Sequence, residues 1–177
     1  EGGARDEGFH SVTLWLEEVV ATAEVLEAMG YVREAEEAST TGGTDGVEAR
    51  IRYRSTDPER GSAVDLMTSD ARSIGRSGAG TIHHVAFRAR NQDEQLAWRA
   101  RLSAAGQQIT PVIDRQYFDA IYFRTPGGVL FEIATDPPGF AVDEDPAHLG
   151  EELKLPKKYE AHRDRIEQVL PHIRVPK

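Results

Sequence analysis

The chain of 177 residues repeats one arrangement of strands and a helix, and this repeat constrains its fold more than any other feature. Residues 9–14 line up with residues 82–87, and residues 64–68 line up with residues 131–135. A repeated unit of this kind usually buries its open face against its neighbour. We therefore expect an α+β fold in which two tandem βαβββ units form curved, mixed sheets around a cavity.

Hydrophobic periodicity places the elements of each unit. The first unit, residues 8–70, has predicted strands at 9–16, 31–36, 47–54 and 63–68 and a helix at 17–29. The second unit, residues 81–140, has predicted strands at 82–88, 109–114, 120–124 and 129–135 and a helix at 92–105. Residues 71–80 are polar and glycine-rich, which indicates a linker between the units. Residues 141–177 form an acidic tail, in which we expect one helix at 157–170 that packs along the outside of the domain.

Composition excludes several classes of protein. The formal net charge of −9, from 30 acidic and 21 basic residues, argues against a nucleic-acid or anionic-membrane partner. The chain has no cysteine, so disulfides and thiolate metal sites are excluded. It contains no apolar run long enough to span a membrane and no signal peptide, so a cytoplasmic protein is the default expectation. The start at Glu1 rather than Met suggests a piece of a longer polypeptide.

Two segments each place a metal-ligating side chain in an apolar strand. His84 lies within residues 81–87, and Glu132 lies within residues 127–135. A carboxylate in a buried strand is costly unless it is paired or binds a cation. Two histidines and a carboxylate on one face make the open site typical of non-heme iron. The sequence shows two of these three ligands clearly.

At this point the chain resembles a known superfamily. Paired βαβββ units with a His on the first strand and a Glu on the last resemble the vicinal oxygen chelate proteins, which include glyoxalases and extradiol dioxygenases. The segments 80–87, 114–118, 121–124 and 130–140 narrow the resemblance to hydroquinone-type ring-cleaving dioxygenases. Such proteins contain four units, and this chain resembles their C-terminal half.

The resemblance implies a metal site in the second unit. His84 and Glu132 match two ligands of Fe(II), with Mn(II) as the alternative metal. Arg115 and Tyr122 match residues that line the substrate pocket, where they can hold a substrate oxygen. His83 matches a residue of the family that can act as a general acid or base.

The first unit keeps only part of such a site. Ser11 occupies the position of the family's third ligand, a His, and His10 lies one residue too early. Asp65 stands where the second unit has its Glu. We expect the third ligand on a missing N-terminal half or on the partner in a homo-oligomer. His10 is an alternative ligand if its strand is bulged, and Asp65 otherwise pairs locally.

Each candidate also has a purely structural interpretation. His84 could be satisfied by a backbone carbonyl, and Glu132 could pair with Arg115 or Arg124. Tyr122 could be a core residue, and a regular strand would point the side chains of consecutive histidines to opposite faces. Surface positions are the simplest interpretation of six further residues: Arg50, Arg52, Arg54, His148, His162 and His172.

The resemblance implies a metal-dependent dioxygenase that opens a hydroquinone-type ring, with a small aromatic substrate and dioxygen as partners. Two alternatives stay open. A glyoxalase-like isomerase or lyase would need a second acidic ligand, for which Asp65 is the candidate. A non-catalytic module would bind an aromatic compound or a metal without turnover.

Overall fold

The two predicted units are both present in the computed structural model, which describes residues 9–38, 47–57, 63–69 and 78–171. The first unit consists of β1 (Ser11–Leu16), α1 (Val20–Ala28), β2 (Tyr31–Ala38), β3 (Val47–Ser55) and β4 (Ala63–Ser69). The second consists of β5 (Val85–Ala89), α2 (Gln92–Ala104), β6 (Ile113–Asp114), β7 (Phe118–Arg124) and β8 (Leu130–Pro138). The predicted α+β class with tandem βαβββ units is confirmed.

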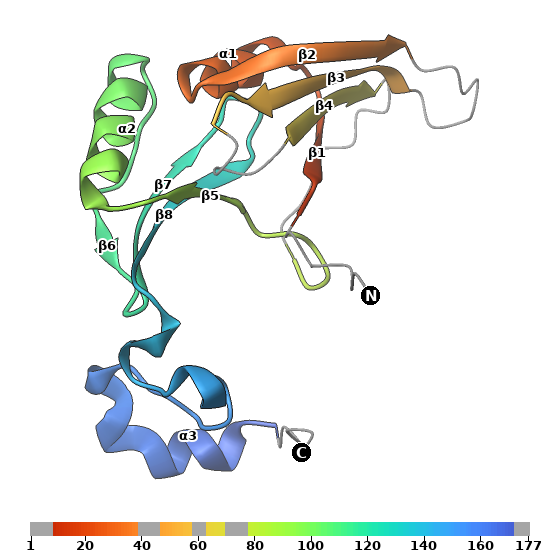
Figure 1. The fold of residues 1–177 in the computed structure, drawn as a ribbon. Coiled ribbons are helices and arrows are strands. Elements are labelled where there is room, and N and C mark those ends of the chain that lie inside the picture. The colour runs from red at the N-terminus through yellow and green to blue at the C-terminus, as the bar shows by residue number, and fades with distance from the viewer. Residues whose placement is uncertain (1–8, 39–46, 58–62, 70–77, 172–177) are drawn as a thin grey trace, which may run out of the picture.

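Both sheets have the same mixed topology. Their strand orders are β1-β4-β3-β2 and β5-β8-β7-β6 (Figure 1). In each unit the first strand pairs in parallel with the fourth, and the other neighbours pair antiparallel. The helix and the other two strands lie between them along the chain and provide the long connection that parallel strands require.

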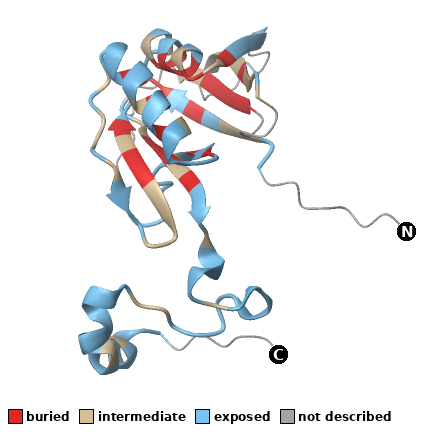
Figure 2. Cartoon of the chain, turned by 60° about the vertical axis from the view of Figure 1, so that its left-hand side comes forward, coloured by how far each residue is buried: buried red, intermediate tan, exposed pale blue. Residues whose placement is uncertain are grey.

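One hydrophobic core unites the two units. Buried side chains from β1, α1 and β4 belong to the same cluster as those from β5, α2, β7 and β8 (Figure 2). Tyr31 of the first unit meets Phe87 of the second edge-on, with ring centroids 5.9 Å apart. The sheet faces that the helices cover form this core. Side chains on the opposite faces of the sheets point away from it.

Two predicted strands are shorter than expected. The strand predicted from residue 82 begins only at Val85, so both histidines precede it. The strand predicted at 109–114 is reduced to Ile113–Asp114. Thr110 bonds to the backbone of Tyr122 through its own N–H and hydroxyl, but Pro111 has no N–H to continue a ladder.

Several predictions fall on residues that are not described. The loop at 39–46, most of the turn after Thr56 and most of the linker at 71–80 lie outside the described residues. The boundaries proposed for the units therefore stay predictions. None of the helices within the described ranges is long and apolar enough to cross a membrane.

The tail differs from its prediction. It contains short 3-10 helices at Phe140–Val142, Pro146–His148 and Lys157–His162, followed by α3 (Arg163–Val169). It extends beyond the end of β8, away from the sheets, instead of packing along the outside of the domain (Figures 1 and 2). None of its described residues is buried, so contacts at its start and within it must hold its shape.

The turn before β8 packs against the first unit and gives a test of the interface between the units. A Cβ at Gly127 would lie 2.7 Å from Thr22 Oγ1 and 3.0 Å from Leu16 Cδ2. Thr22 and Leu16 are buried and cannot move away easily, so Gly127→Ala should destabilise the chain by about 1–3 kcal/mol in urea denaturation. Gly78→Ala, which meets nothing within 4 Å, is the control. Equal stability of the two variants would contradict this packing.

Candidate metal site

A carboxylate is buried in the middle of β8. Glu132 is 3% exposed, although its neighbours Phe131 and Ile133 point into the hydrophobic core. Because alternate residues of a strand point to opposite faces, Glu132 lies on the face away from that core. Such burial requires partners that compensate for the lost hydration of the carboxylate.

Two side chains supply these contacts. The Tyr122 hydroxyl donates to Glu132 Oε1 at 2.8 Å, because β7 and β8 place these two residues directly opposite each other. His84 Nε2 lies 2.8 Å from Glu132 Oε2. Arg124 bonds instead to the Gly128 carbonyl, and Arg115 to Tyr122, so the predicted alternative of an ion pair between Glu132 and either arginine is wrong.

Arg115 completes the contacts of Tyr122. Its Nε donates to the Tyr122 hydroxyl at 3.1 Å, and its guanidinium carbon lies 5.2 Å from the centre of the ring. Burial raises the pKa of Tyr122, the hydrogen bond from Arg115 opposes this, and the bond to Glu132 adds to it. The phenol therefore stays protonated at neutral pH, and its proton is available to Glu132.

The two consecutive histidines touch each other. His83 Nδ1 lies 2.9 Å from His84 Nδ1, and the rings are nearly perpendicular. The expectation that a regular strand separates them is wrong, because both residues precede β5. In a neutral ring one nitrogen donates and the other accepts. A His84 that donates from Nε2 to Glu132 therefore accepts at Nδ1 from His83.

The two donor atoms are spaced as two ligands of one divalent metal ion would be. Two ligand atoms about 2.1 Å from one metal and at a right angle lie about 3 Å apart, close to the observed spacing of His84 Nε2 and Glu132 Oε2. Imidazole and carboxylate together suit iron or manganese. The side chain of His84 is 37% exposed, so this end of the site is open. Among the described residues, no cluster of three or more His, Asp or Glu side chains forms a complete metal site.

The first unit's own candidate for a third ligand does not join this pair. His10 is exposed, and its Nδ1 lies 3.4 Å from Ser11 Oγ. Neither residue forms a group with the second unit's ligands in the described part of the chain. His84 and Glu132 are thus a pair of potential ligands that is open on the side of His84.

The first sheet contains a counterpart of this pair in the same register. Arg52, Asp65 and Thr13 lie side by side across β3, β4 and β1, as Tyr122, Glu132 and Ala86 do across β7, β8 and β5. This correspondence equates Asp65 with Glu132 and Arg52 with Tyr122. We propose that the first unit holds a degenerate metal site.

Arginines neutralise the first unit's carboxylate. Arg52 forms a two-pronged contact with Asp65 at 2.7 and 2.8 Å, and Arg50 approaches it at 3.1 Å. The interpretation of these two arginines as the hydrated face of a strand is therefore incomplete, because they are partly exposed and also pair with Asp65. Arg54 pairs with Glu34 at the surface. The signal in the sequence was Asp65 itself, a carboxylate within an apolar run that required a cation.

The pairing of Asp65 predicts how stability depends on pH. The Arg52 hydrogen bonds lower the pKa of Asp65 below its ordinary value, more than burial raises it. The stabilisation is therefore present above the unfolded pKa of about 3.9 and is lost as pH falls through the folded pKa. Asp65→Asn should cost roughly 2 kcal/mol in urea denaturation at pH 7 and progressively less below about pH 4.

Glu34→Gln is the matched control for this experiment. It removes the exposed partner of Arg54 on the same sheet and should leave stability nearly unchanged, because an exposed ion pair contributes little. A loss for Asp65→Asn that stayed the same from pH 7 to pH 3 would contradict the assignment of the ion pair as its cause.

Comparison with known proteins agrees with this architecture. The family model of the Glyoxalase/Bleomycin resistance protein/Dioxygenase superfamily matches residues 33–133. The chain is 46% identical over 164 residues to the "Putative ring-cleaving dioxygenase MhqO" of Bacillus subtilis, covering 92% of this chain and 49% of that protein. It is 41% identical over 92 residues to the chlorohydroquinone/hydroquinone 1,2-dioxygenase of Sphingobium indicum, covering 50% of this chain and 28% of that protein. The chain thus spans about half the length of the first of these relatives.

Solved structures show the same fold. A crystal structure from Bacillus subtilis, of a protein described as a "putative dioxygenase", has a TM-score of 0.78 and 44% identity, covering 97% of this chain and 52% of that one. The fosfomycin resistance protein FosX of Listeria monocytogenes, solved with Mn(II), has a TM-score of 0.53 and 19% identity, covering 72% of this chain and 91% of that one. The latter likeness concerns the fold alone. The chain belongs to the Glyoxalase/Bleomycin resistance protein/Dioxygenase superfamily.

Proposed function

We propose that this chain is the metal-binding half of a ring-cleaving dioxygenase that acts on hydroquinone-type aromatic compounds. The observation that carries the proposal is the convergence of His84 Nε2 and Glu132 Oε2 at 2.8 Å beside a protonated Tyr122. The names of the MhqO relative and of the Sphingobium enzyme support the reaction and the class of substrate.

His84 and Glu132 would hold Fe(II), with Mn(II) as the second candidate. The bound metal supplies Lewis acidity toward the substrate's phenolic oxygen and a site for dioxygen. Glu132 is prepared for this role because Tyr122 occupies its Oε1 and leaves Oε2 directed at His84. A partner that orients a ligand in this way typically raises metal affinity 10–100-fold.

The other candidate residues bind the substrate and hold protons. The guanidinium of Arg115 sits beside Tyr122, where it can hold an oxygen anion of the substrate by charge-assisted hydrogen bonds. Tyr122 keeps its proton on the phenolic oxygen and thereby fixes the position of Glu132. His83 contacts His84 through Nδ1 and leaves Nε2 as the atom that can exchange a proton with the substrate.

The third metal ligand would come from outside this chain. The relative MhqO is about twice as long as the matched region, so a second half of such a protein is one source. A second copy of this chain is the other source. Either partner would have to reach the exposed side of His84, because the other side of the pair is occupied by Tyr122.

The alternative functions are less well supported. A glyoxalase-like isomerase would need Asp65 as a further acidic ligand, but Arg52 and Arg50 already neutralise that carboxylate. A binding module without turnover remains the second candidate, and the pairing of just two potential ligands among the described residues is the observation in its favour. Oxygen uptake with hydroquinone separates it from the dioxygenase.

Metal binding tests the ligand pair. Glu132→Gln and His84→Ala should each weaken the binding of Mn(II), measured by titration calorimetry, by at least about tenfold, because each removes one of two protein donors. The tail supplies a matched control, since His148 Nδ1 and Glu151 Oε2 form an exposed pair at 3.1 Å. His148→Ala should leave the affinity unchanged. Equal losses in all three variants would contradict a site at Glu132.

Substrate binding tests Arg115. Arg115→Gln should lower kcat/KM for hydroquinone in oxygen-uptake assays by roughly 10–100-fold, mainly through KM, while the affinity for Mn(II) is retained. Arg124→Gln, which loses only a bond to the Gly128 carbonyl, is the control. Unchanged kinetics in Arg115→Gln would assign this arginine a structural role only.

A further inference from the structure

The turn that carries Arg115 has a strained backbone. It joins β6 to β7, and Gln116 at its tip has a φ of 72°, a left-handed value that side chains other than Gly rarely adopt. Asp114 Oδ1 accepts from Gln116 N at 2.6 Å, and Arg115 N donates to the Phe118 carbonyl at 2.9 Å. Such a conformation persists only where surrounding contacts hold it in place.

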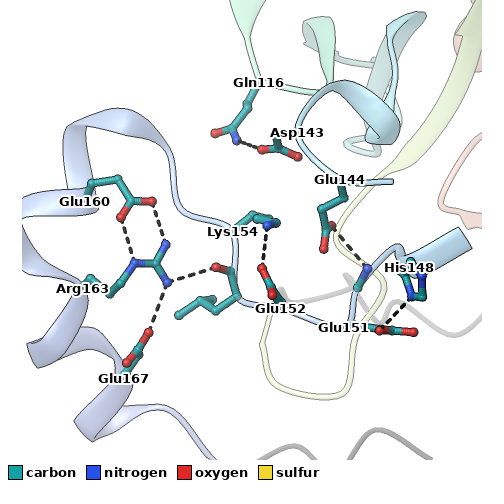
Figure 3. A network of polar contacts seen from close by, with 12 residues as sticks. Gln116, Asp143, Glu144, His148, Glu151, Glu152, Lys154, Glu160, Arg163 and Glu167 are labelled. Carbon is teal, nitrogen blue, oxygen red and sulfur yellow. Dashed lines mark hydrogen bonds and ion pairs between the residues drawn. The ribbon is translucent and has the colours of Figure 1, made fainter. Parts of the chain in front are cut away.

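Those contacts come from the start of the tail. Asp143 Oδ2 accepts from Gln116 Nε2 at 2.9 Å and from the Tyr117 hydroxyl at 3.2 Å (Figure 3 shows the first). Gly139 N donates to the Tyr117 carbonyl at 2.8 Å, and the ring of Phe140 lies 5.2 Å from that of Tyr117. Two consecutive residues of the turn are therefore bound by one carboxylate of the tail.

The tail is itself braced by ion pairs. Arg163 contacts both Glu160 and Glu167 and donates to the Leu153 carbonyl, and Lys154 pairs with Glu152 (Figure 3). These contacts span three segments of the tail that lack a buried core. They join these segments of the tail to one another, whereas the printed side-chain partners of Asp143 are the turn residues Gln116 and Tyr117.

We propose that Asp143 is a positioning residue for Arg115. It fixes the strained turn through Gln116 and Tyr117, so that the Arg115 guanidinium stays within hydrogen-bond distance of Tyr122. The contact between tail and turn stands on the geometry alone. Its consequence for substrate rests on the function proposed above for Arg115.

The side chain of Arg115 itself provides the direct measurement. Its Nε–H, bonded to Tyr122, should give a protected signal in the nitrogen–proton NMR spectrum of the full chain. In Asp143→Ala we expect this signal to shift toward the position of a free arginine, and the Arg115 backbone amide to exchange about tenfold faster, because a charge-assisted bond to the turn is lost. An unchanged Nε–H signal would overturn the proposal.

Two further variants keep the test decisive. Gln116→Gly removes the amide donor while suiting the positive φ, so it should free Arg115 without added backbone strain. Glu152→Ala removes a tail carboxylate that pairs only with Lys154 and should leave the Arg115 signal as in the parent chain. The same shift in Glu152→Ala would show a general loosening of the tail and would contradict a specific role of Asp143.

Oxygen-uptake kinetics then separate the two proposals. If the Arg115 signal shifts in Asp143→Ala and KM for hydroquinone rises severalfold with kcat little changed, positioning and substrate binding are both supported. If the signal shifts without any change in kinetics, Asp143 still positions Arg115, and the proposed role of Arg115 toward substrate is refuted.

Discussion

A carboxylate in the middle of a buried strand must be compensated, and each of the two sheets is built around one. In the first sheet two guanidiniums, from Arg52 and Arg50, meet Asp65. In the second sheet a neutral phenol and an imidazole meet Glu132. Among the described residues no Arg or Lys forms an ion pair with Glu132, so this carboxylate is the one whose charge a metal ion can balance. The same βαβββ frame thus yields an ion pair in one unit and a proposed metal ligand in the other.

The contacts of Glu132 form a continuous chain to the surface. Tyr122 receives a hydrogen bond from Arg115, and the turn that carries Arg115 is held by Asp143 at the start of the tail. Arg115, Tyr122 and Glu132 belong to two consecutive strands and the turn before them, so the order of these strands brings them together. The tail, in which no residue from 141 to 171 is buried, would then matter to the site through a single carboxylate.

The sequence predicted the repeat, both helices and the conjunction of His84 with Glu132, because all of these depend on local periodicity and on one repeated motif. It did not predict that the histidines precede β5, since an apolar run does not show where pairing begins. It also missed the partners of Asp65, because register between strands decides which arginine faces which acid. The contact of Asp143 with the Arg115 turn joins segments that no sequence pattern connects.

The most direct test of the central claim is to locate the metal itself. Diffraction data collected from manganese-soaked crystals, on both sides of the metal's absorption edge, give an anomalous map of its position. The account predicts one peak in each chain within coordination distance of both His84 Nε2 and Glu132 Oε2. A map with peaks only at other sites, such as His148 and Glu151 in the tail, would contradict it.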